Sequence, residues 1–376
     1  METISLESRR DFLKKVGPGV AGLSGAASML AMASSSAAQE SSGKTLGVAL
    51  LGLGVLSTGQ LGPALQKTKH CRLVGIVSGT PEKRQKWKEK YNIPEKNVYS
   101  YENFDRIADN SDIDIAYVVT PNALHAEYTI RAAKAGKHVL CEKPMEVSVK
   151  KCEQMIQACK DAKVQLAIGY RCQFAPHHLE MIRLAREKEF GAIKLIEASF
   201  GFKIGDTTQP HVKWRLDHEL AGGGALADVG IYALQGARYV TGEEPVEITA
   251  IETKTDRVKF KEVDESIFWS MRFPSGVIAN CGTTYNANGM NRLAAFAEKG
   301  AFWLDPAYSY GGLQGRTSKG EMNLPQVDHF AAEMDDFAQC IMQKRPTKVP
   351  GEEGLRDVKL MGAIYESIRK GRPVKV

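Results

Sequence analysis

Residues 44–61, KTLGVALLGLGVLSTGQL, decide which fold the first half of the chain can adopt. The apolar run from Leu46 to Leu51 has the composition of a strand that is buried on both faces of a parallel sheet. It leads into a GxGxxS pattern, Gly52 to Ser57, which departs from the GxGxxG of dinucleotide-binding turns at the third position. The two glycines permit a tight turn and a close approach to a pyrophosphate, and the small Ser57 still allows close helix packing. A plain glycine turn is the alternative, so the surrounding sequence has to decide.

Strand and helix patterns alternate through the sequence that follows. We expect strands over 72–77, 114–119, 137–141 and 164–169, and helices over 81–91, 101–109, 122–136 and 149–162. Such alternation predicts a doubly wound parallel sheet of the Rossmann type. The glycine pattern therefore sits in the context that it needs, and we predict a dinucleotide-binding domain over residues 44–165.

The end of the second expected strand indicates which dinucleotide binds. An acidic residue at this point would bind the ribose 2′-hydroxyl of NAD. Here the strand runs into VSGTPEKR, residues 77–84, whose tip lacks an acid. Ser78, Lys83 and Arg84 are suited instead to hold a 2′-phosphate, although Lys83 and Arg84 are equally placed to be solvated helix charges. We therefore predict NADP in preference to NAD.

Two further motifs follow expected strands, and ligands of open α/β sheets bind at the carboxyl ends of strands. Thr120-Pro121-Asn122 follows the strand over 114–119, with His125 shortly after it. Glu142-Lys143-Pro144 follows the strand over 137–141. A lysine at this point is either a surface charge or a cleft residue that donates to a substrate hydroxyl and lowers the pKa of a neighbouring acid.

The segment GGGALADVGIY, residues 222–232, predicts a glycine loop that opens a helix. Asp228 and Tyr232 are four positions apart and so share one face of that helix. The simple interpretation is that Asp228 is a surface carboxylate and Tyr232 a core aromatic. However, Asp228 stands among small and apolar residues, where an unpaired carboxylate is costly, so we expect it to have a hydrogen-bonding role.

At these motifs the chain resembles the glucose–fructose oxidoreductase/inositol dehydrogenase family, from about residue 46 to the C-terminus. The resemblance is carried by LHAEYTIRAAKAGKHVLCEKPM (124–145), IGYRC (168–172), WRLDHELAGGGALADVGIYALQGARYVTGEEP (214–245) and PGEEGLRDVKLMGAIYESIRKGRPV (350–374). Many members have a histidine where this chain has Tyr232. The resemblance implies that Lys143 lies beside the reacting carbon, that Tyr232 is the general acid/base, and that Asp228 positions the substrate or the lysine.

The motifs and the resemblance together give one set of expected cofactor contacts. These are Gly52, Gly54, Val55, Leu56, Ser78, Lys83, Arg84, Thr120, Asn122, His125, Glu142, Lys143, Arg171, Trp214 and Arg215. Arg171, Trp214 and Arg215 match family positions near the nicotinamide and the substrate, and Thr120, Asn122 and His125 match cofactor contacts. The sugar end is less defined: Tyr308, Asp305, His211 and Lys213 are candidates only.

The resemblance also implies a second domain with an open, mostly antiparallel sheet, which we place over residues 166–350. Alternating patterns over 193–203, 246–255, 265–273, 276–286 and 291–304 favour strands independently. Helices are expected near 328–344 and 352–370, and residues 351–376 are expected to return toward the first domain. In such families the free sheet face often mediates dimers or tetramers, so we expect a homo-oligomer.

The expected chemistry is the oxidation of a sugar carbinol, with a hydride passing to nicotinamide and a proton to a base. The reference pKa of tyrosine, about 10, is too high for an efficient base near neutrality. We therefore expect the Lys143 ammonium to stabilise the Tyr232 phenolate and to lower this pKa. Protonated Tyr232 would serve as the acid in the reverse reaction, so one site can run both directions.

The N-terminus indicates where this chemistry takes place. Arg9 and Arg10 precede an uncharged stretch over 16–38 that is rich in Gly, Ala and Ser. This is the pattern of a twin-arginine export signal, expected over residues 1–38 and read by the export machinery. A basic tail and an uncleaved anchor are the alternatives. A periplasmic location would favour an enzyme that keeps NADP bound, oxidises an aldose to its lactone and reduces a second sugar carbonyl to an alditol.

The sequence leaves two other functions open. One is an ordinary sugar dehydrogenase or reductase that exchanges its cofactor, since the segment between the signal and the first strand is short for an arm that encloses a cofactor. The other is a non-catalytic sugar-binding protein, which Lys143, Asp228 and Tyr232 together make improbable.

Composition excludes several classes of protein. The net charge of +6 is spread along the chain without a basic block, which argues against nucleic-acid binding. The seven cysteines form no CxxC pair, which is poor support for a disulfide scaffold. No HxxxH or HxH spacing occurs, and we predict no metal site.

Overall fold

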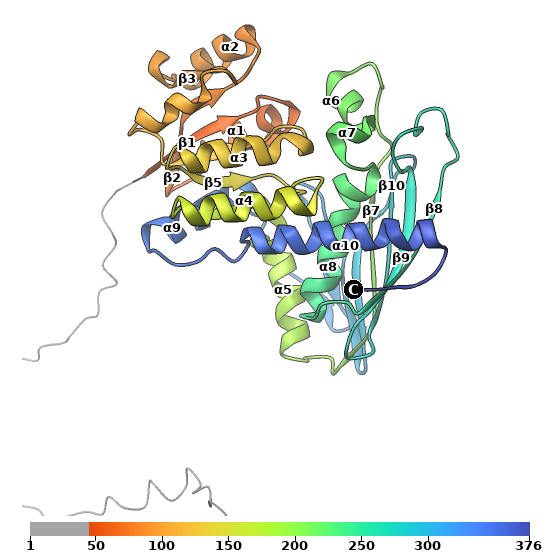
Figure 1. Ribbon diagram of the computed structural model, residues 1–376. Coiled ribbons are helices and arrows are strands. Elements are labelled where there is room, and N and C mark those ends of the chain that lie inside the picture. Colours follow the sequence, from red (N-terminus) through yellow and green to blue (C-terminus); the bar gives the residue numbers. More distant parts are fainter. Residues whose placement is uncertain (1–44) are drawn as a thin grey trace, which may run out of the picture. The chain divides into compact units, whose positions relative to one another are not determined.

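The computed structural model describes residues 45–376, which belong to one compact unit containing two β-sheets (Figure 1). The expected export signal over residues 1–38 lies outside the described residues. Between residues 45 and 376, no helix combines the length and the apolar character that a membrane crossing requires.

The first sheet has six parallel strands in the order β3-β2-β1-β4-β5-β6. The strands are β1 (Leu46–Leu51), β2 (Cys71–Val77), β3 (Val98–Tyr99), β4 (Ile115–Val118), β5 (His138–Cys141) and β6 (Leu166–Ile168). Every residue of β1 is buried, as its uninterrupted apolar run indicates. The predicted doubly wound parallel sheet is confirmed. Successive strands are added on one side of β1 up to β3 and on its other side from β4 onward, and such folds bind ligands at this switch point between β1 and β4.

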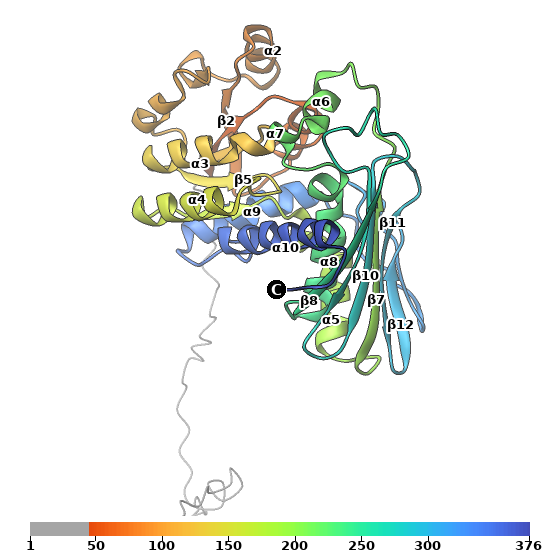
Figure 2. The ribbon, with the colours of Figure 1, turned by 45° about the vertical axis from the view of Figure 1, so that its right-hand side comes forward.

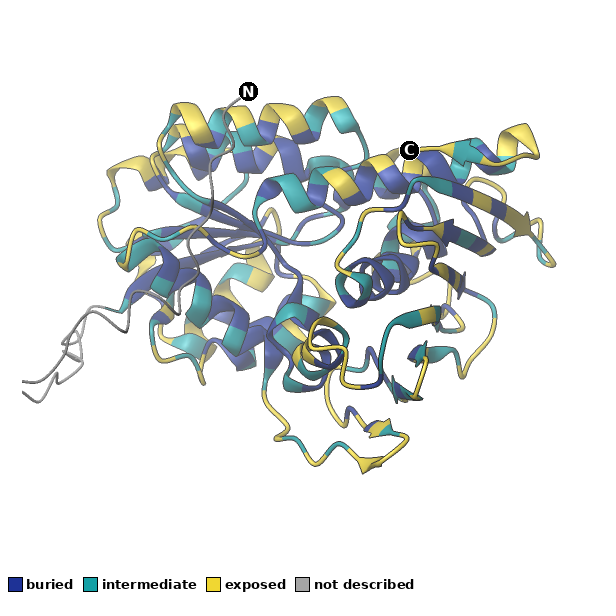
Figure 3. Cartoon of the chain, turned by 90° about the horizontal axis from the view of Figure 1, so that it is seen from below, coloured by how far each residue is buried: buried dark blue, intermediate teal, exposed yellow. Residues whose placement is uncertain are grey.

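Helices cover both faces of this sheet, and their outer faces are exposed while the strands between them are buried (Figure 3). They include α2 (Pro81–Tyr91), α3 (His125–Lys134) and α4 (Val149–Asp161). The helix expected over 101–109 is a 3₁₀ segment, Phe104–Asp109. The helix expected directly after the glycine turn is a π-helical turn, Ser57–Leu61, followed by the short α1 (Gly62–Ala64) with Pro63 in it.

The second sheet has nine strands in the order β14-β13-β12-β11-β7-β10-β9-β8-β15. They are β7 (Ile193–Gly201), β8 (Glu247–Thr253), β9 (Ser266–Arg272), β10 (Ile278–Thr284), β11 (Asn291–Ala297), β12 (Gly300–Leu304), β13 (Gly315–Thr317), β14 (Gly320–Glu321) and β15 (Val374–Lys375). All neighbours are antiparallel except β7 and β10, so the predicted mostly antiparallel sheet is confirmed.

One face of the second sheet is covered by helices and the other is open. Helices α5 (Pro176–Arg186) and α8 (Ile231–Thr241) lie on the same side of the sheet (Figure 2). On the strands, Ile251, Phe268 and Ile278 are 69%, 49% and 42% exposed. These apolar side chains belong to adjacent strands β8, β9 and β10, which gives the open face an apolar character.

The expected boundary at residue 165 has to move past Ile168. The short apolar strand β6 pairs with β5 and completes the first sheet, and the second part begins with the 3₁₀ segment Arg171–Phe174. Helix α10 (Gly351–Lys370) packs against α4 and β6 at the first sheet and against β8 at the second. Helix α9 (His329–Met342) packs against β2 and the segment Arg171–Phe174, so the C-terminal helices join the two sheets.

Candidate active site

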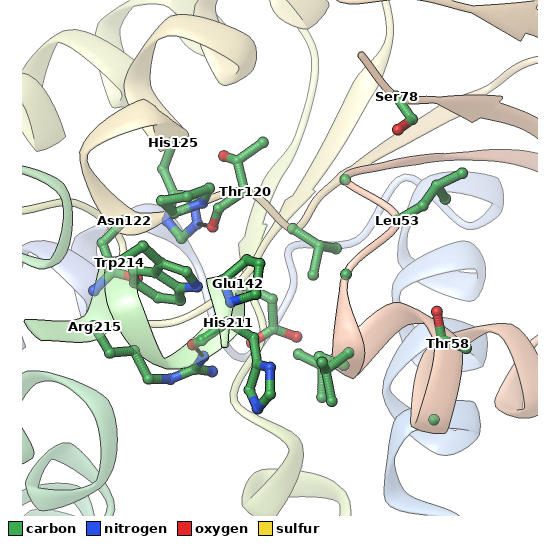
Figure 4. Close-up of a pocket in the computed structure, with 18 of the residues that line it drawn as sticks. Leu53, Thr58, Ser78, Thr120, Asn122, His125, Glu142, His211, Trp214 and Arg215 are labelled. Atoms are coloured by element: carbon green, nitrogen blue, oxygen red, sulfur yellow. Dashed lines mark hydrogen bonds between the residues drawn. The ribbon is translucent and has the colours of Figure 1, made fainter. Parts of the chain in front are cut away.

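A cavity of about 730 Å³ opens at the carboxyl ends of β1, β2, β4 and β5. Its size is that of a ligand pocket. The lining comprises Gly52, Leu53, Gly54, Val55, Leu56, Thr58, Gly59, Ser78, Gly79, Thr80, Lys83, Tyr101, Val119, Thr120, Pro121, Asn122, His125, Glu142, Lys143, Pro210, His211, Trp214, Arg215, Asp228, Tyr232, Tyr310 and Phe330. All expected catalytic and cofactor residues line it except Arg84 and Arg171. Figure 4 shows Ser78 at one end and Arg215, Trp214 and His211 toward the other.

The glycine turn after β1 has the shape that a pyrophosphate requires. Gly52 adopts φ +99°, and a Cβ at this position would lie 2.4 Å from the carbonyl oxygen of Val119. The Ser57 hydroxyl donates to the Gly52 carbonyl at 2.5 Å, so serine at the third motif position closes the turn. Gly54 is exposed and lines the cavity, and a Cβ there would meet no atom within 4 Å. The space beside Gly54 is therefore open for a phosphate to approach the backbone.

These two glycines should respond differently to a methyl group. Gly52→Ala should destabilise the fold, because it combines a left-handed backbone with a clash against the strand end at Val119. Gly54→Ala should leave the melting temperature nearly unchanged, because a methyl group there contacts no protein atom. It should weaken cofactor binding by roughly tenfold or more, because the methyl group occupies the space through which a phosphate approaches the backbone. Thermal unfolding measures the change in stability, and the quenching of protein fluorescence on titration with NADP measures the change in binding. Equal stability losses in both variants would contradict this account of the turn.

The end of β2 presents a polar surface without an acid. Ser78 is buried and lines the cavity, Lys83 is exposed and lines it, and Gly79 and Thr80 lie between them. Arg84 does not line the cavity; its guanidinium donates to the Ser78 carbonyl at 2.5 Å and so holds the strand end. Lys83 is thus the cation presented at this end, and the residues fit a 2′-phosphate better than a bare ribose.

The residues that follow β4 line the cavity and also form hydrogen bonds to the segments around it. The Asn122 amide donates to the Ala221 carbonyl at 2.8 Å, directly before the glycine loop over 222–224. The His125 ring nitrogens lie 2.9 Å from the Thr120 carbonyl and 3.0 Å from the Pro144 carbonyl. The buried Thr120 hydroxyl has no partner within the described part of the chain, and it lines the cavity, so it is free to contact a cofactor.

Asp228 is the centre of a polar cluster that also includes Lys143, Arg215 and Tyr285. The Lys143 ammonium donates to its carbonyl oxygen at 2.6 Å and lies 3.2 Å from Oδ1. Arg215 Nε and the Tyr285 hydroxyl donate to Oδ2 at 3.1 and 2.7 Å. Burial alone would raise the pKa of Asp228, but Lys143 and Arg215 outweigh it and hold the pKa below its ordinary value. The carboxylate is therefore ionised, and the expected hydrogen-bonding role has identified partners.

Tyr232 lines the cavity one helical turn from Asp228 and is 8% exposed. The Lys143 ammonium lies 5.1 Å from the centre of its ring. The cation that contacts the Tyr232 hydroxyl, however, is Arg171, whose Nε donates to it at 3.2 Å. Burial raises the pKa of Tyr232, and Arg171 opposes this rise. The expected tuning of the phenol by Lys143 alone therefore needs correction, because Lys143 is hydrogen bonded to Asp228.

Sequence reasoning missed several residues of the site. Tyr285 follows β10 and reaches Asp228, while Tyr310 and Phe330 line the cavity from segments far along the chain. The one sequence signal for Tyr285 was its position as an aromatic residue at the end of an expected strand. Among the candidates named for the sugar end, His211 lines the cavity, whereas Asp305, Tyr308 and Lys213 do not. Tyr308 instead packs behind Tyr232, with ring centres 5.7 Å apart.

Two buried histidines at the site should make the fold sensitive to acid. Burial lowers the pKa of His125 and of His329 to about 4 each, from 6.5. The unfolded chain therefore takes up protons first as the pH falls, so stability present above pH 6.5 is lost toward pH 4. We expect a loss of roughly 2 kcal/mol per histidine at pH 5. Urea unfolding at pH 7.5, 6 and 5 measures it, and His329→Gln should remove its share. A flat profile would contradict the assignment.

Comparison with known proteins places this geometry among oxidoreductases. Residues 46–170 match a family model described as "Oxidoreductase family, NAD-binding Rossmann fold". Residues 178–303 match the "GFO/IDH/MocA C-terminal domain", and residues 316–376 match the "Oxidoreductase family, C-terminal alpha/beta domain". The three matches extend from β1 to the C-terminal residue.

Individual relatives include enzymes that act on sugars. The chain is 30% identical to D-xylose 1-dehydrogenase (NADP+) of Haloarcula marismortui, over 85% of this chain and 90% of the relative. It is 27% identical to 1,5-anhydro-D-fructose reductase of Ensifer adhaerens, over 75% and 84% of the two chains. Among solved structures, aldose-aldose oxidoreductase from Caulobacter crescentus, complexed with glycerol, superposes with a TM-score of 0.85 at 46% identity, covering 89% of this chain and all of that one.

Proposed function

The chain belongs to the GFO/IDH/MocA oxidoreductase family, and we propose that it is an NADP-dependent sugar oxidoreductase. The observation that carries this is one cavity in which a dinucleotide-type glycine turn and the cluster of Lys143, Asp228 and Tyr232 face the same space. Two relatives named as enzymes of sugar substrates and a solved aldose–aldose oxidoreductase support the substrate class.

NADP is the proposed cofactor, and it supplies hydride acceptance and donation when bound. The turn at Gly52 and Gly54 would hold the pyrophosphate, Ser78 and Lys83 the 2′-phosphate, and the Thr120 hydroxyl a polar group nearby. The name of the xylose dehydrogenase relative gives NADP as well. Of the acids that line the cavity, Glu142 follows β5 and Asp228 lies on the helical turn Leu226–Gly230, so neither follows β2.

The chain's own groups would handle the proton. Tyr232 would take the proton of the sugar hydroxyl during oxidation and return one to a carbonyl during reduction. Lys143 and Asp228 present an ammonium and a carboxylate beside it, which suits the binding of hydroxyl groups on adjacent carbons.

We further propose that the enzyme passes reducing equivalents between two sugars through a cofactor that stays bound. An aldose would become its lactone, and a second sugar, ketose or aldose, would become an alditol. The similar aldose–aldose oxidoreductase supports this reaction type by its name. We also propose that the twin-arginine machinery exports the protein to the periplasm. We propose that it forms a homo-oligomer through the apolar open face of the second sheet.

Exchange of NADP with solution is the second candidate, and the D-xylose 1-dehydrogenase relative favours it. Purified protein distinguishes the two. If the cofactor is retained, nicotinamide should co-purify after extensive dialysis, one aldose should raise the absorbance of reduced nicotinamide, and a second sugar should bring it back. If dialysis removes all nicotinamide and turnover requires stoichiometric NADP, the exchanging dehydrogenase is correct.

A further inference from the structure

Arg171 is a buried cation whose charge has no carboxylate partner between residues 45 and 376. Its guanidinium is 1% exposed and donates to the carbonyl oxygens of Tyr308 and Ser309 at 2.5 and 3.3 Å. It also lies 3.2 Å from Nδ1 of His329 and donates to the Tyr232 hydroxyl. A buried charge held only by neutral groups is costly and calls for a function.

Two other cations near the site share a carboxylate partner. Lys143 and Arg215 both pair with Asp228, at 3.2 and 3.1 Å. The rings of Tyr232, Tyr310 and Phe330 surround Arg171 at 4.8, 4.8 and 5.7 Å from its Cζ atom. Aromatic faces stabilise a guanidinium but leave its net charge in place. Of the two phenols in this group, Tyr232 is the one whose hydroxyl accepts a hydrogen bond from Arg171.

Two carboxyl groups, those of Glu333 and Glu142, lie near Arg171, but within the described residues neither forms an ion pair with it. Glu333 on α9 is 1% exposed, and neither of its oxygens has a hydrogen-bond partner in the part of the chain that is described. Burial raises the pKa of Glu333 well above its ordinary value, and neighbouring Glu142 reinforces this. Glu142 is also buried, which raises its pKa, and it accepts a hydrogen bond from the Tyr117 hydroxyl at 2.7 Å. Glu333 therefore offers Arg171 no hydrogen bond within the described residues.

We propose that Arg171 is the catalytic counter-ion of the Tyr232 phenolate, while Lys143 is committed to Asp228 and the substrate. This inference rests on the proposed sugar oxidation. There, the sugar O–H bond breaks and its proton forms the O–H bond of Tyr232, while the carbinol hydrogen leaves with its electron pair as hydride to NADP. Reduction of a carbonyl reverses both transfers. Arg171 keeps its own protons throughout, because a guanidinium does not lose one at accessible pH.

The groups that face Tyr232 come from several elements. They are Arg171 and Cys172 on the 3₁₀ segment, Glu142 and Lys143 after β5, Asp228 on the preceding helical turn, Phe200 on β7, and Tyr308 and Tyr310. Of the cations, Arg171 makes the hydrogen bond to the phenol oxygen and Lys143 faces the ring. Removing the Arg171 charge should therefore shift the ionisation of Tyr232 more than removing that of Lys143.

The test compares Arg171→Met with wild type by ultraviolet titration of tyrosinate, in which Tyr232→Phe identifies the signal of Tyr232 among the twelve tyrosines. We expect the Tyr232 titration to move upward by roughly one to three pH units, as loss of an adjacent opposite charge does. The acidic limb of the pH profile for sugar oxidation, where activity falls as Tyr232 becomes protonated, should move with it. Arg171→Lys should restore part of the shift, and Arg171→Gln replaces the methionine variant if that fails to fold.

Glu333→Gln is the matched control, because it keeps the shape of the buried Glu333 side chain, and it should leave the titration of Tyr232 unchanged. The proposal is overturned by an unmoved titration in Arg171→Met, by a larger shift in Lys143→Met, or by a downward shift in Glu333→Gln, which would show that Glu333 is the charged partner of Arg171. The tyrosinate signal needs no turnover. A protein without activity on sugars would refute the proposed function and still report on Arg171.

Discussion

Tyr232→Phe should lower the rate of sugar oxidation by roughly a hundred- to ten-thousand-fold, which is the range that one general acid/base contributes. The phenol lines the cavity together with Lys143 and Asp228, and the substitution removes the proposed proton acceptor. Packing should survive, because the ring and its contacts with Phe200 and Tyr308 stay in place. Stopped-flow absorbance of reduced nicotinamide measures the loss.

Tyr308→Phe provides the matched control for this substitution. Tyr308 is buried behind Tyr232, does not line the cavity, and has a hydroxyl without a partner among the described residues. Its loss should leave hydride transfer within about twofold of wild type. If Tyr232→Phe retained more than a tenth of wild-type oxidation, or if both variants lost activity equally, Tyr232 would not be the acid/base.

Lys143→Met should have the second largest effect. The ammonium holds Asp228 through two contacts and faces the cavity, so its removal takes away a donor to the substrate and frees the carboxylate. We expect kcat/KM for the aldose to fall by roughly a hundred- to a thousand-fold, as for removal of one preorganised donor. The pKa of Asp228 should also rise, because Lys143 is the first of the two cations that depress it.

Lys151→Met is the control for Lys143→Met, since Lys151 pairs with Glu146 at 3.1 Å and does not line the cavity. Steady-state kinetics over a range of aldose concentrations separates kcat from KM for both variants. An unchanged kcat/KM in Lys143→Met, or an equal loss in Lys151→Met, would remove Lys143 from the catalytic cluster.

The elements that local signals define were predicted well. Helix α2 was expected over 81–91 and occupies Pro81–Tyr91, because Pro81 stands at its first position and Asn92 ends it in a left-handed conformation with φ 53°. Strand β1 was equally clear from its apolar run. Strand β3 was missed because its two residues are too few for a periodic pattern.

The site residues likewise fall into those that a local sequence pattern indicates and those that it does not. Gly52, Lys143, Asp228 and Tyr232 stand in local patterns, and all four line the cavity. The partners that give them their chemistry come from elsewhere: Arg171 meets Tyr232 across 61 positions, and Tyr285 meets Asp228 across 57. Such pairs depend on how the second sheet packs against α8 and the turn before it, which no local pattern encodes. The sequence therefore indicated Tyr232 as a candidate base, but it did not predict that Arg171 contacts the Tyr232 hydroxyl.

The central claim is that reducing equivalents pass from one sugar to another inside the protein. It is tested most directly with an aldose deuterated at the carbon that is oxidised, a second sugar as acceptor, and excess unlabelled NADPH in solution. Mass spectrometry of the alditol follows the label. Our account expects nearly every alditol molecule to carry one deuterium from the aldose. An alditol that is largely unlabelled would show exchange with the NADPH in solution and would contradict it.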